Sequence, residues 1–254
     1  MHRQNFIIIL ILIIVANYNI PMTVKTNYNY TTIFISEIHS DPEPKHVLID
    51  LVKRLGIQTV CLEMSGSLEG KRRTLEKDIS FATGLSKRIP KGLTKEEITS
   101  FFRGGGCTEE EAFLFPLFVQ RLPGLKAHYE MLNQLAELKV EVIGIDDRGG
   151  SVRQMLNASP DEREAIAKRR DEKMLTDLLA QRIEGKSCVV LTGAYHTLSL
   201  TQGFVDRGLQ EERDFLCLFP TSKSEVDTDL IRTPEERAIF IDTVVRRILE
   251  IGSD

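Results

Sequence analysis

The stretch Thr31-Thr32-Ile33-Phe34-Ile35-Ser36-Glu37-Ile38-His39-Ser40-Asp41 decides the fold class of this chain. Its first half is β-branched and apolar, which is typical of a buried strand, and its second half is polar. Because side chains alternate along an extended chain, Glu37 and His39 fall on the same side where this strand ends. A carboxylate and an imidazole in that place indicate a metal site or an acid–base site.

The residues that follow predict a strand–helix–strand unit. After the break at Asp41-Pro42-Glu43-Pro44, apolar residues recur at helical spacing, and Gly56 ends that helix. A second strand is expected over residues 57–64. Two strands joined by a helix of this length run parallel, with a right-handed crossover.

Three more strands are expected over residues 139–145, 187–192 and 214–219, and a last helix begins at Pro234. Residues from about 65 to 138 are predicted to be a helical insertion, in which Pro123-Gly124 separates one helix from the next. The predicted fold is therefore α/β, a mainly parallel central sheet flanked by helices, with the insertion capping the carboxyl edge of the strands. A closed hydrolase barrel is disfavoured because it needs eight strands.

The composition is that of an ordinary globular protein, with 42% hydrophobic and 28% charged residues in 254. The formal net charge is −4 and the basic residues are dispersed, so nucleic acid is not an expected partner. No CxxC pair occurs among the four cysteines, which argues against a zinc knuckle or a thioredoxin-type centre.

The N-terminal segment has a different character. A basic start precedes the apolar run of residues 6–16, which is typical of a signal peptide or short membrane anchor over residues 1–21. The run is shorter than the ~20 residues that span a bilayer. Residues 22–254 would then be a single exported domain, on the periplasmic or extracellular side, with membrane association through this segment. The alternative is a buried strand, or an extension upstream of a cytoplasmic protein that begins at Met22.

Four of the predicted strands end in carboxylates or imidazoles. The first ends in Glu37 and His39 and the second in Glu63, while the others are followed by Asp146, Asp147 and His196. Ligands bind at the carboxyl ends of the strands in open parallel sheets, so these groups are expected to converge on one pocket. Glu37, His39 and His196 are the predicted ligands of a divalent metal, Mn, Co or Zn, which would activate water. Without a metal, Glu37 and His39 would act as acid and base.

Two segments of the chain resemble a known family. The run from Ser36 to His46 resembles the Gly-Glu-x-His opening of ChaN-type haem-binding proteins, and it leads to a strand ending in Glu63-Met64. Residues 168–174 and 185–196 resemble the later part of that family, a helix with Arg and Met and then a strand closed by Gly-x-x-His. The chain thus resembles the Tiki/TraB/ChaN/erythromycin-esterase superfamily. It has Ser36 where the family usually has Gly, and no lipoprotein Cys follows the apolar run.

The resemblance implies a pocket made by five residues, to which a catalytic role is assigned: Glu37, His39, Glu63, Arg170 and His196. Members of the superfamily include metal-dependent proteases, esterases and haem-binding proteins. The leading expectation is a metal-assisted hydrolase of a peptide or small-molecule ester, with Arg170 positioning the substrate. The alternative is a haem-binding or haem-uptake protein without turnover, with His46 and Tyr195 as candidate haem contacts.

Overall fold

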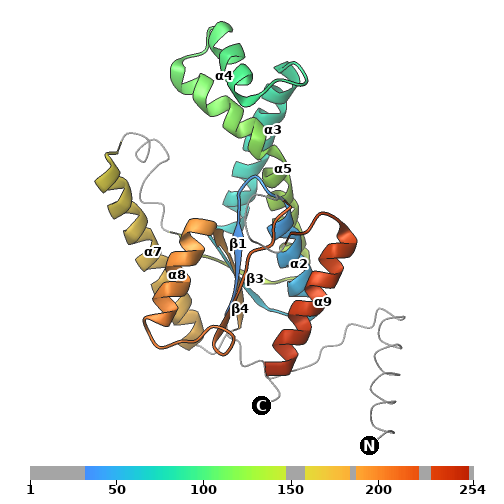
Figure 1. Ribbon diagram of the computed structural model, residues 1–254, viewed down its shortest axis with the longest axis vertical. Helices are drawn as coiled ribbons and strands as arrows, with labels where there is room; N and C mark the ends of the chain where they lie inside the picture. Colours follow the sequence, from blue (N-terminus) through green and yellow to red (C-terminus); the bar gives the residue numbers. More distant parts are fainter. Residues whose placement is uncertain (1–31, 147–157, 184–186, 223–229, 252–254) are drawn as a thin grey trace, which may run out of the picture.

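The computed structural model describes residues 32–146, 158–183, 187–222 and 230–251, and its described part is an α/β fold (Figure 1). Five strands form one open sheet in the order β3-β2-β4-β1-β5. Their bounds are β1 Thr32–Glu37, β2 Thr59–Leu62, β3 Glu141–Gly144, β4 Cys188–Gly193 and β5 Phe215–Leu218. Every pairing is parallel, which confirms the predicted fold class and the position of all five expected strands.

The strand order places β4 at the centre of the sheet. β4 pairs with β1 on one side, where Glu37 lies opposite Gly193, and with β2 on the other, where Leu62 lies opposite Leu191. The first two strands are parallel, as expected for the strand–helix–strand unit, but β4 lies between them. The carboxyl ends of β1, β4, β2 and β3 consequently form one continuous edge.

Two helical layers cover the sheet because alternate strand residues face opposite sides. In β1, Ile33 and Ile35 join the core beneath α2 (Glu43–Leu55), part of α5 (Glu109–Glu137) and α9 (Pro234–Ile251). Phe34 points to the other face, where α7 (Pro160–Ile183) and α8 (Ala194–Val205) pack. Phe34 there makes edge-to-face contacts with Phe204 and Phe215.

The insertion consists of α3 (Leu68–Arg88), α4 (Lys95–Gly104) and α5, which rise from the carboxyl edge of the sheet as an arm (Figure 1). Thr94 and Thr108 form capping boxes with Glu97 and Glu111, which satisfy backbone N–H groups at the starts of α4 and α5. A separate aromatic cluster centred on Phe102 holds the far end of the arm together. The base of α5 lies over the sheet edge, as the sequence predicts.

The predicted break at Pro123-Gly124 is wrong. α5 continues through both Pro116 and Pro123 from Glu109 to Glu137. Each proline lacks one backbone N–H and would weaken an isolated helix. Packing of α5 against α2, α3 and α4 supplies the support that lets this helix continue.

The predicted signal or anchor over residues 1–21 lies outside the described residues. Among the residues that the structure describes, no helix is long and apolar enough to cross a membrane.

Candidate functional site

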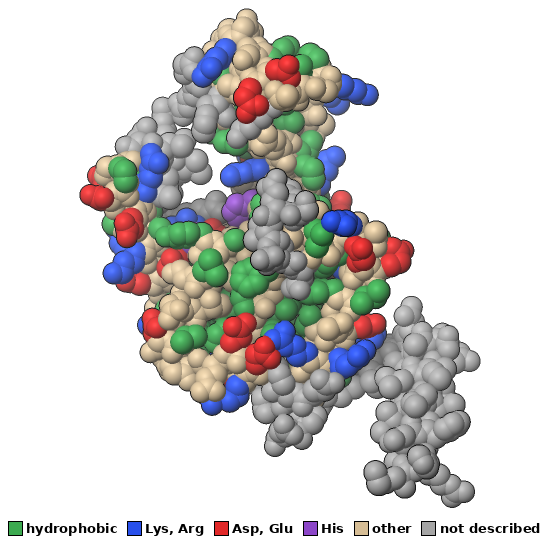
Figure 2. Space-filling model, in the orientation of Figure 1, with side chains coloured by type: hydrophobic (Ala, Val, Ile, Leu, Met, Phe, Trp, Pro, Cys, Tyr) green, Lys and Arg blue, Asp and Glu red, His purple; other side chains and the backbone are tan. Residues whose placement is uncertain are grey.

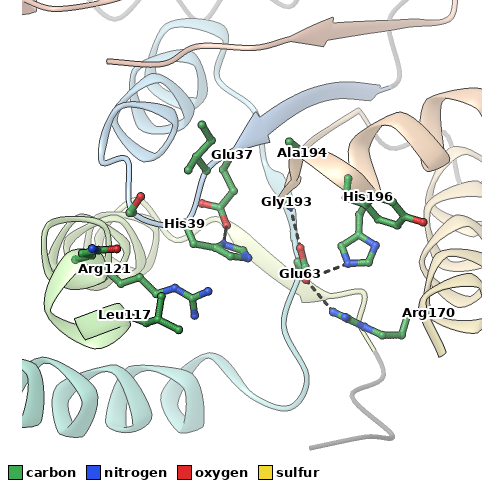
Figure 3. Close-up of a pocket in the computed structure, with 13 residues that line it drawn as sticks. Glu37, His39, Glu63, Leu117, Arg121, Arg170, Gly193, Ala194 and His196 are labelled. Carbon is green, nitrogen blue, oxygen red and sulfur yellow. Dashed lines mark hydrogen bonds and ion pairs between the residues drawn. The ribbon is translucent and has the colours of Figure 1, made fainter. Parts of the chain in front are cut away.

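The side chains at the carboxyl edge of the sheet surround one cavity of about 470 Å³. All five predicted catalytic residues line it: Glu37, His39, Glu63, Arg170 and His196. Asp146 joins them through Arg170, whereas Asp147 lies outside the described residues. The structure therefore brings together residues from the ends of β1, β2, β3 and β4 and from α7 and α8, and Figure 3 shows the side chains of Glu37, His39, Glu63, Arg170 and His196.

Glu37 orients His39 at the end of β1. The Glu37 carboxylate accepts a hydrogen bond from Nδ1 of His39 at 2.9 Å, and its other oxygen pairs with the ammonium of Lys45. Burial alone would raise the pKa of Glu37, but Lys45 and the bond from His39 hold it far below its usual range. Glu37 is thus ionised and can only accept, so Nδ1 of His39 carries the proton and Nε2 is free to accept one.

Lys45 is a buried cation on the first turn of α2. Its side chain is 1% exposed, and its Nζ also donates to the carbonyl of Asp41 at 2.9 Å. Asp41 in turn accepts hydrogen bonds from Thr221 and Ser222 at 2.7 to 2.8 Å. This network fixes the loop between β1 and α2, and with it the direction of His39.

Glu63 is the central carboxylate of the cavity. One of its oxygens accepts the backbone N–H of Gly193 at 2.9 Å, and the other accepts Nη2 of Arg170 at 2.8 Å. Arg170 also donates from Nε and Nη2 to the two oxygens of Asp146, both at 2.9 Å. Burial would lower the pKa of Arg170, but Asp146 and Glu63 raise it. Arg170 therefore serves here to tie two strand ends together.

His196 is held by a second carboxylate. Nδ1 of His196 lies 2.5 Å from Oδ1 of Asp171 on α7, and its Nε2 lies 3.6 Å from Oε1 of Glu63. Figure 3 shows the rings of His39 and His196 turned toward Glu63 from its two sides. A Cβ added at Gly193 would lie 3.3 Å from Oε2 of Glu63 and 3.7 Å from Nε2 of His39, so a larger residue would narrow this space.

The part of α5 from Leu117 to Gly124 forms the remaining wall of the cavity. A Cβ at Gly124 would come within 1.9 Å of the His39 carbonyl oxygen, so the helix and the β1 loop pack backbone to backbone. One turn before this contact, Leu117, Gln120 and Arg121 line the cavity. Figure 2 shows a histidine at the surface where the arm meets the sheet, with basic side chains above it.

The two candidate haem contacts lie in different places. Tyr195 is 67% exposed and lines the rim of the cavity, where its ring contacts that of His196 edge to face. His46 lies on α2 beside Glu43, 3.8 Å from its carboxylate, and does not line the cavity. Only Tyr195 is available to a ligand in the cavity.

The structure fits the predicted metal site only for two of its three ligands, His39 and His196. Each cavity histidine has its Nδ1 on a carboxylate and presents Nε2, which is how metal-binding imidazoles are commonly held. Glu37 does not fit as a third ligand in this arrangement because His39 and Lys45 engage its oxygens. In the described ranges, no three His, Cys, Asp or Glu side chains are grouped as a metal site.

Several residues at the site had no role in the sequence interpretation: Lys45, Asp171, Arg121 and Gly124. Asp171 immediately follows Arg170 in a helix rich in charged residues. That sequence pattern does not indicate which of these side chains contacts His196. Pro123-Gly124 was a signal, but it pointed to a turn instead of a close contact.

The fold and site define an open parallel α/β protein with a Glu/His pocket at its strand ends. No protein-family model matches the chain, and no curated protein matches it in sequence. A solved structure described as that of the type III effector HopBA1 matches with a TM-score of 0.37 and 12% identity, over 82% of this chain and 84% of that one. A likeness at this TM-score supports no inference about this protein.

Proposed function

We propose that this protein is a hydrolase of the Tiki/ChaN-like type that activates water between His39 and His196. The observation that carries this proposal is the pair of imidazoles, each bonded through Nδ1 to a carboxylate and each directing Nε2 to the same cavity. A carboxylate in that position holds the imidazole tautomer that can accept a proton and stabilises the imidazolium that forms. The substrate bond is an ester or peptide bond, as the resemblance implies.

The two histidines divide the proton transfers. One imidazole takes a proton from water at Nε2 while water attacks the carbonyl carbon, and the other, protonated, gives its proton to the leaving oxygen or nitrogen. Glu63, 3.6 Å from Nε2 of His196, stabilises positive charge on that ring. Arg170 and the N–H of Gly193 keep Glu63 in place.

A divalent metal remains part of the proposal. His39 and His196 would hold it through Nε2, and it would supply water with a lowered pKa. Elemental analysis of the full chain and of the His39→Ala/His196→Ala double variant tests this directly. Metal present in the wild type and lost from the double variant supports the metal-assisted form, and activity without bound metal supports the acid–base form.

The hydrolase itself is tested on a panel of 4-nitrophenyl esters and fluorogenic peptides. His39→Ala and His196→Ala should each lower kcat by about 10²–10⁴, while circular dichroism stays unchanged. His46→Ala is the matched control, because His46 is outside the cavity and should leave the rate unchanged. The proposal fails if the wild type does not exceed the uncatalysed rate, or if both cavity variants turn over as fast as the wild type.

One observation favours the second candidate, a haem-binding protein without turnover. Tyr195 is exposed at the rim next to His196, and both residue types can ligate haem iron. Titration with haemin should then shift the Soret band, and Tyr195→Phe should abolish the shift. No shift at micromolar haemin rejects this candidate.

A further inference from the structure

Arg121 is a cation in the cavity that neither the fold nor the proposed chemistry uses. It lies on α5, one turn before the contact between Gly124 and His39, and it lines the cavity together with Leu117 and Gln120. Figure 3 shows it on the α5 wall, across the cavity from Ala194 and His196. Its position is therefore that of a group that meets the substrate away from the reacting bond.

The buried or half-buried cations of the site are already neutralised, whereas Arg121 is exposed at the cavity. Lys45 pairs with Glu37, and Arg170 pairs with both Glu63 and Asp146. Arg121 makes no ion pair or hydrogen bond with any residue in the described part of the chain. A guanidinium stays charged at any physiological pH and presents a planar fork that matches the oxygens of a carboxylate or phosphate.

The opposite wall favours the same kind of ligand. α8 begins at Ala194 directly on the cavity, and no side chain caps its first turn. The uncapped N–H groups of a helix start carry partial positive charge. An anion between this wall and Arg121 would meet these N–H groups on one side and the guanidinium on the other, while the neighbouring Glu63 carboxylate is already engaged by Arg170 and by the N–H of Gly193.

We propose that the pocket selects an anionic substrate, with Arg121 binding a carboxylate or phosphate group of the molecule whose ester or amide bond is cleaved. This inference rests on the proposed function for the identity of the bond, but not for the binding of the anion. Arg121 acts as a specificity residue: it holds the substrate and takes no part in proton transfer.

Binding is measured first, because it requires no turnover. Succinate and inorganic phosphate are titrated into the full chain by calorimetry, one arm for each oxyanion, with Arg121→Gln and Lys126→Gln compared to wild type. Lys126 is a matched control, an exposed cation on the same helix that does not line the cavity. Arg121→Gln should weaken the binding of the preferred anion by about tenfold or more, and Lys126→Gln should leave that affinity unchanged.

Turnover provides the second readout. Wild type should prefer 4-nitrophenyl hydrogen succinate, which is charged, over the neutral 4-nitrophenyl methyl succinate. Arg121→Gln should lose that preference through a higher KM, with kcat nearly unchanged. The inference is overturned if wild type binds neither anion, or if Arg121→Gln binds both as tightly as wild type. Anion binding that depends on Arg121 in a protein that cleaves neither esters nor peptides would instead overturn only the proposed function.

Discussion

Gly124 of α5 and His39 of the β1 loop touch backbone to backbone, since a Cβ at Gly124 would lie 1.9 Å from the His39 carbonyl oxygen. This contact fixes the arm to the loop after β1, from which the side chain of His39 enters the cavity. Any side chain at position 124 must move either the helix or His39.

Gly124→Ala should therefore impair the site more than the fold. We expect the rate of ester hydrolysis to fall by at least about tenfold, because a displacement of about 1 Å at a catalytic group is enough to cost that much. Steady-state kinetics together with a urea unfolding curve measure the two effects. Gly84→Ala on α3 is the control: nothing lies within 4 Å of a Cβ there, and alanine should stabilise the helix by roughly 0.5–1 kcal/mol. Equal rates in the two variants would contradict this account.

The buried pair of Lys45 and Glu37 should dominate local stability. Both side chains are almost fully buried, at 1% and 4% exposure. Lys45→Met leaves the Glu37 carboxylate without its cation, which should cost about 3–5 kcal/mol in the free energy of unfolding. Lys45→Met/Glu37→Gln should cost less than the sum of the single changes, as urea unfolding of all four proteins would reveal.

Lys53 supplies the comparison within the same helix. It is exposed and bonds only Gln134, at 2.8 Å, among the described residues. Lys53→Met should change the free energy of unfolding by less than about 1 kcal/mol. A loss as large as that of Lys45→Met would show that burial of the pair is not what matters.

Asp171→Asn tests whether the carboxylate sets the tautomer of His196. An amide at this position can donate to Nδ1, which would move the ring proton of His196 to Nε2 and remove one of the two proton acceptors from the cavity. We expect kcat to fall by about 10²–10⁴ without a change in fold. Asp177→Asn on the same helix removes only an ion pair with Lys173 and should leave kcat unchanged. Retention of kcat in Asp171→Asn would assign proton acceptance to His39 alone.

His128 should make stability depend on pH. Its Nε2 is buried with no hydrogen-bond partner in the described part of the chain. Burial, opposed in part by Glu37, lowers the pKa of His128 from 6.5 to about 4. Between those values the unfolded chain binds a proton that the folded protein does not, so the stability that neutral His128 provides is complete above pH 6.5 and is lost as pH falls toward 4.

His128→Phe should remove this slope, an effect on the order of 2–3 kcal/mol between the two ends of the range. Unfolding in urea at pH 7 and at pH 5 measures it. His46→Gln, at a more exposed histidine on α2, should lose as much stability as wild type over that interval. If His128→Phe also does so, another group carries the pH dependence.

The strand ends were predictable because their signals are local. Runs such as Cys188 to Leu191 are apolar throughout, as strands buried on both faces must be, and the polar residues that follow such a run, here beginning with Thr192, mark its carboxyl end. Once the strands are taken to be parallel, the convergence of Glu37, Glu63 and His196 follows from topology alone.

The partners of these residues were not predictable in the same way. Asp171 reaches His196 from a different element, and Lys45 pairs with Glu37 across a turn, so both contacts depend on how α7 and α2 pack. The predicted break in α5 at Pro123-Gly124 was wrong for a related reason. Proline and glycine act locally to break a helix, but contacts with α2 and α3 override that tendency.

The order of the strands also has a consequence for how this protein is made. Of the described strands β1 is synthesised first, yet both of its neighbours, β4 and β5, come from residues 188–218. Until those residues leave the ribosome, β1 has two unpaired edges, which are the surfaces on which nascent chains aggregate. A chain truncated before β4 would lack Gly193 and His196 and would leave both edges of β1 unpaired, and we expect it to be a substrate for chaperones and proteases.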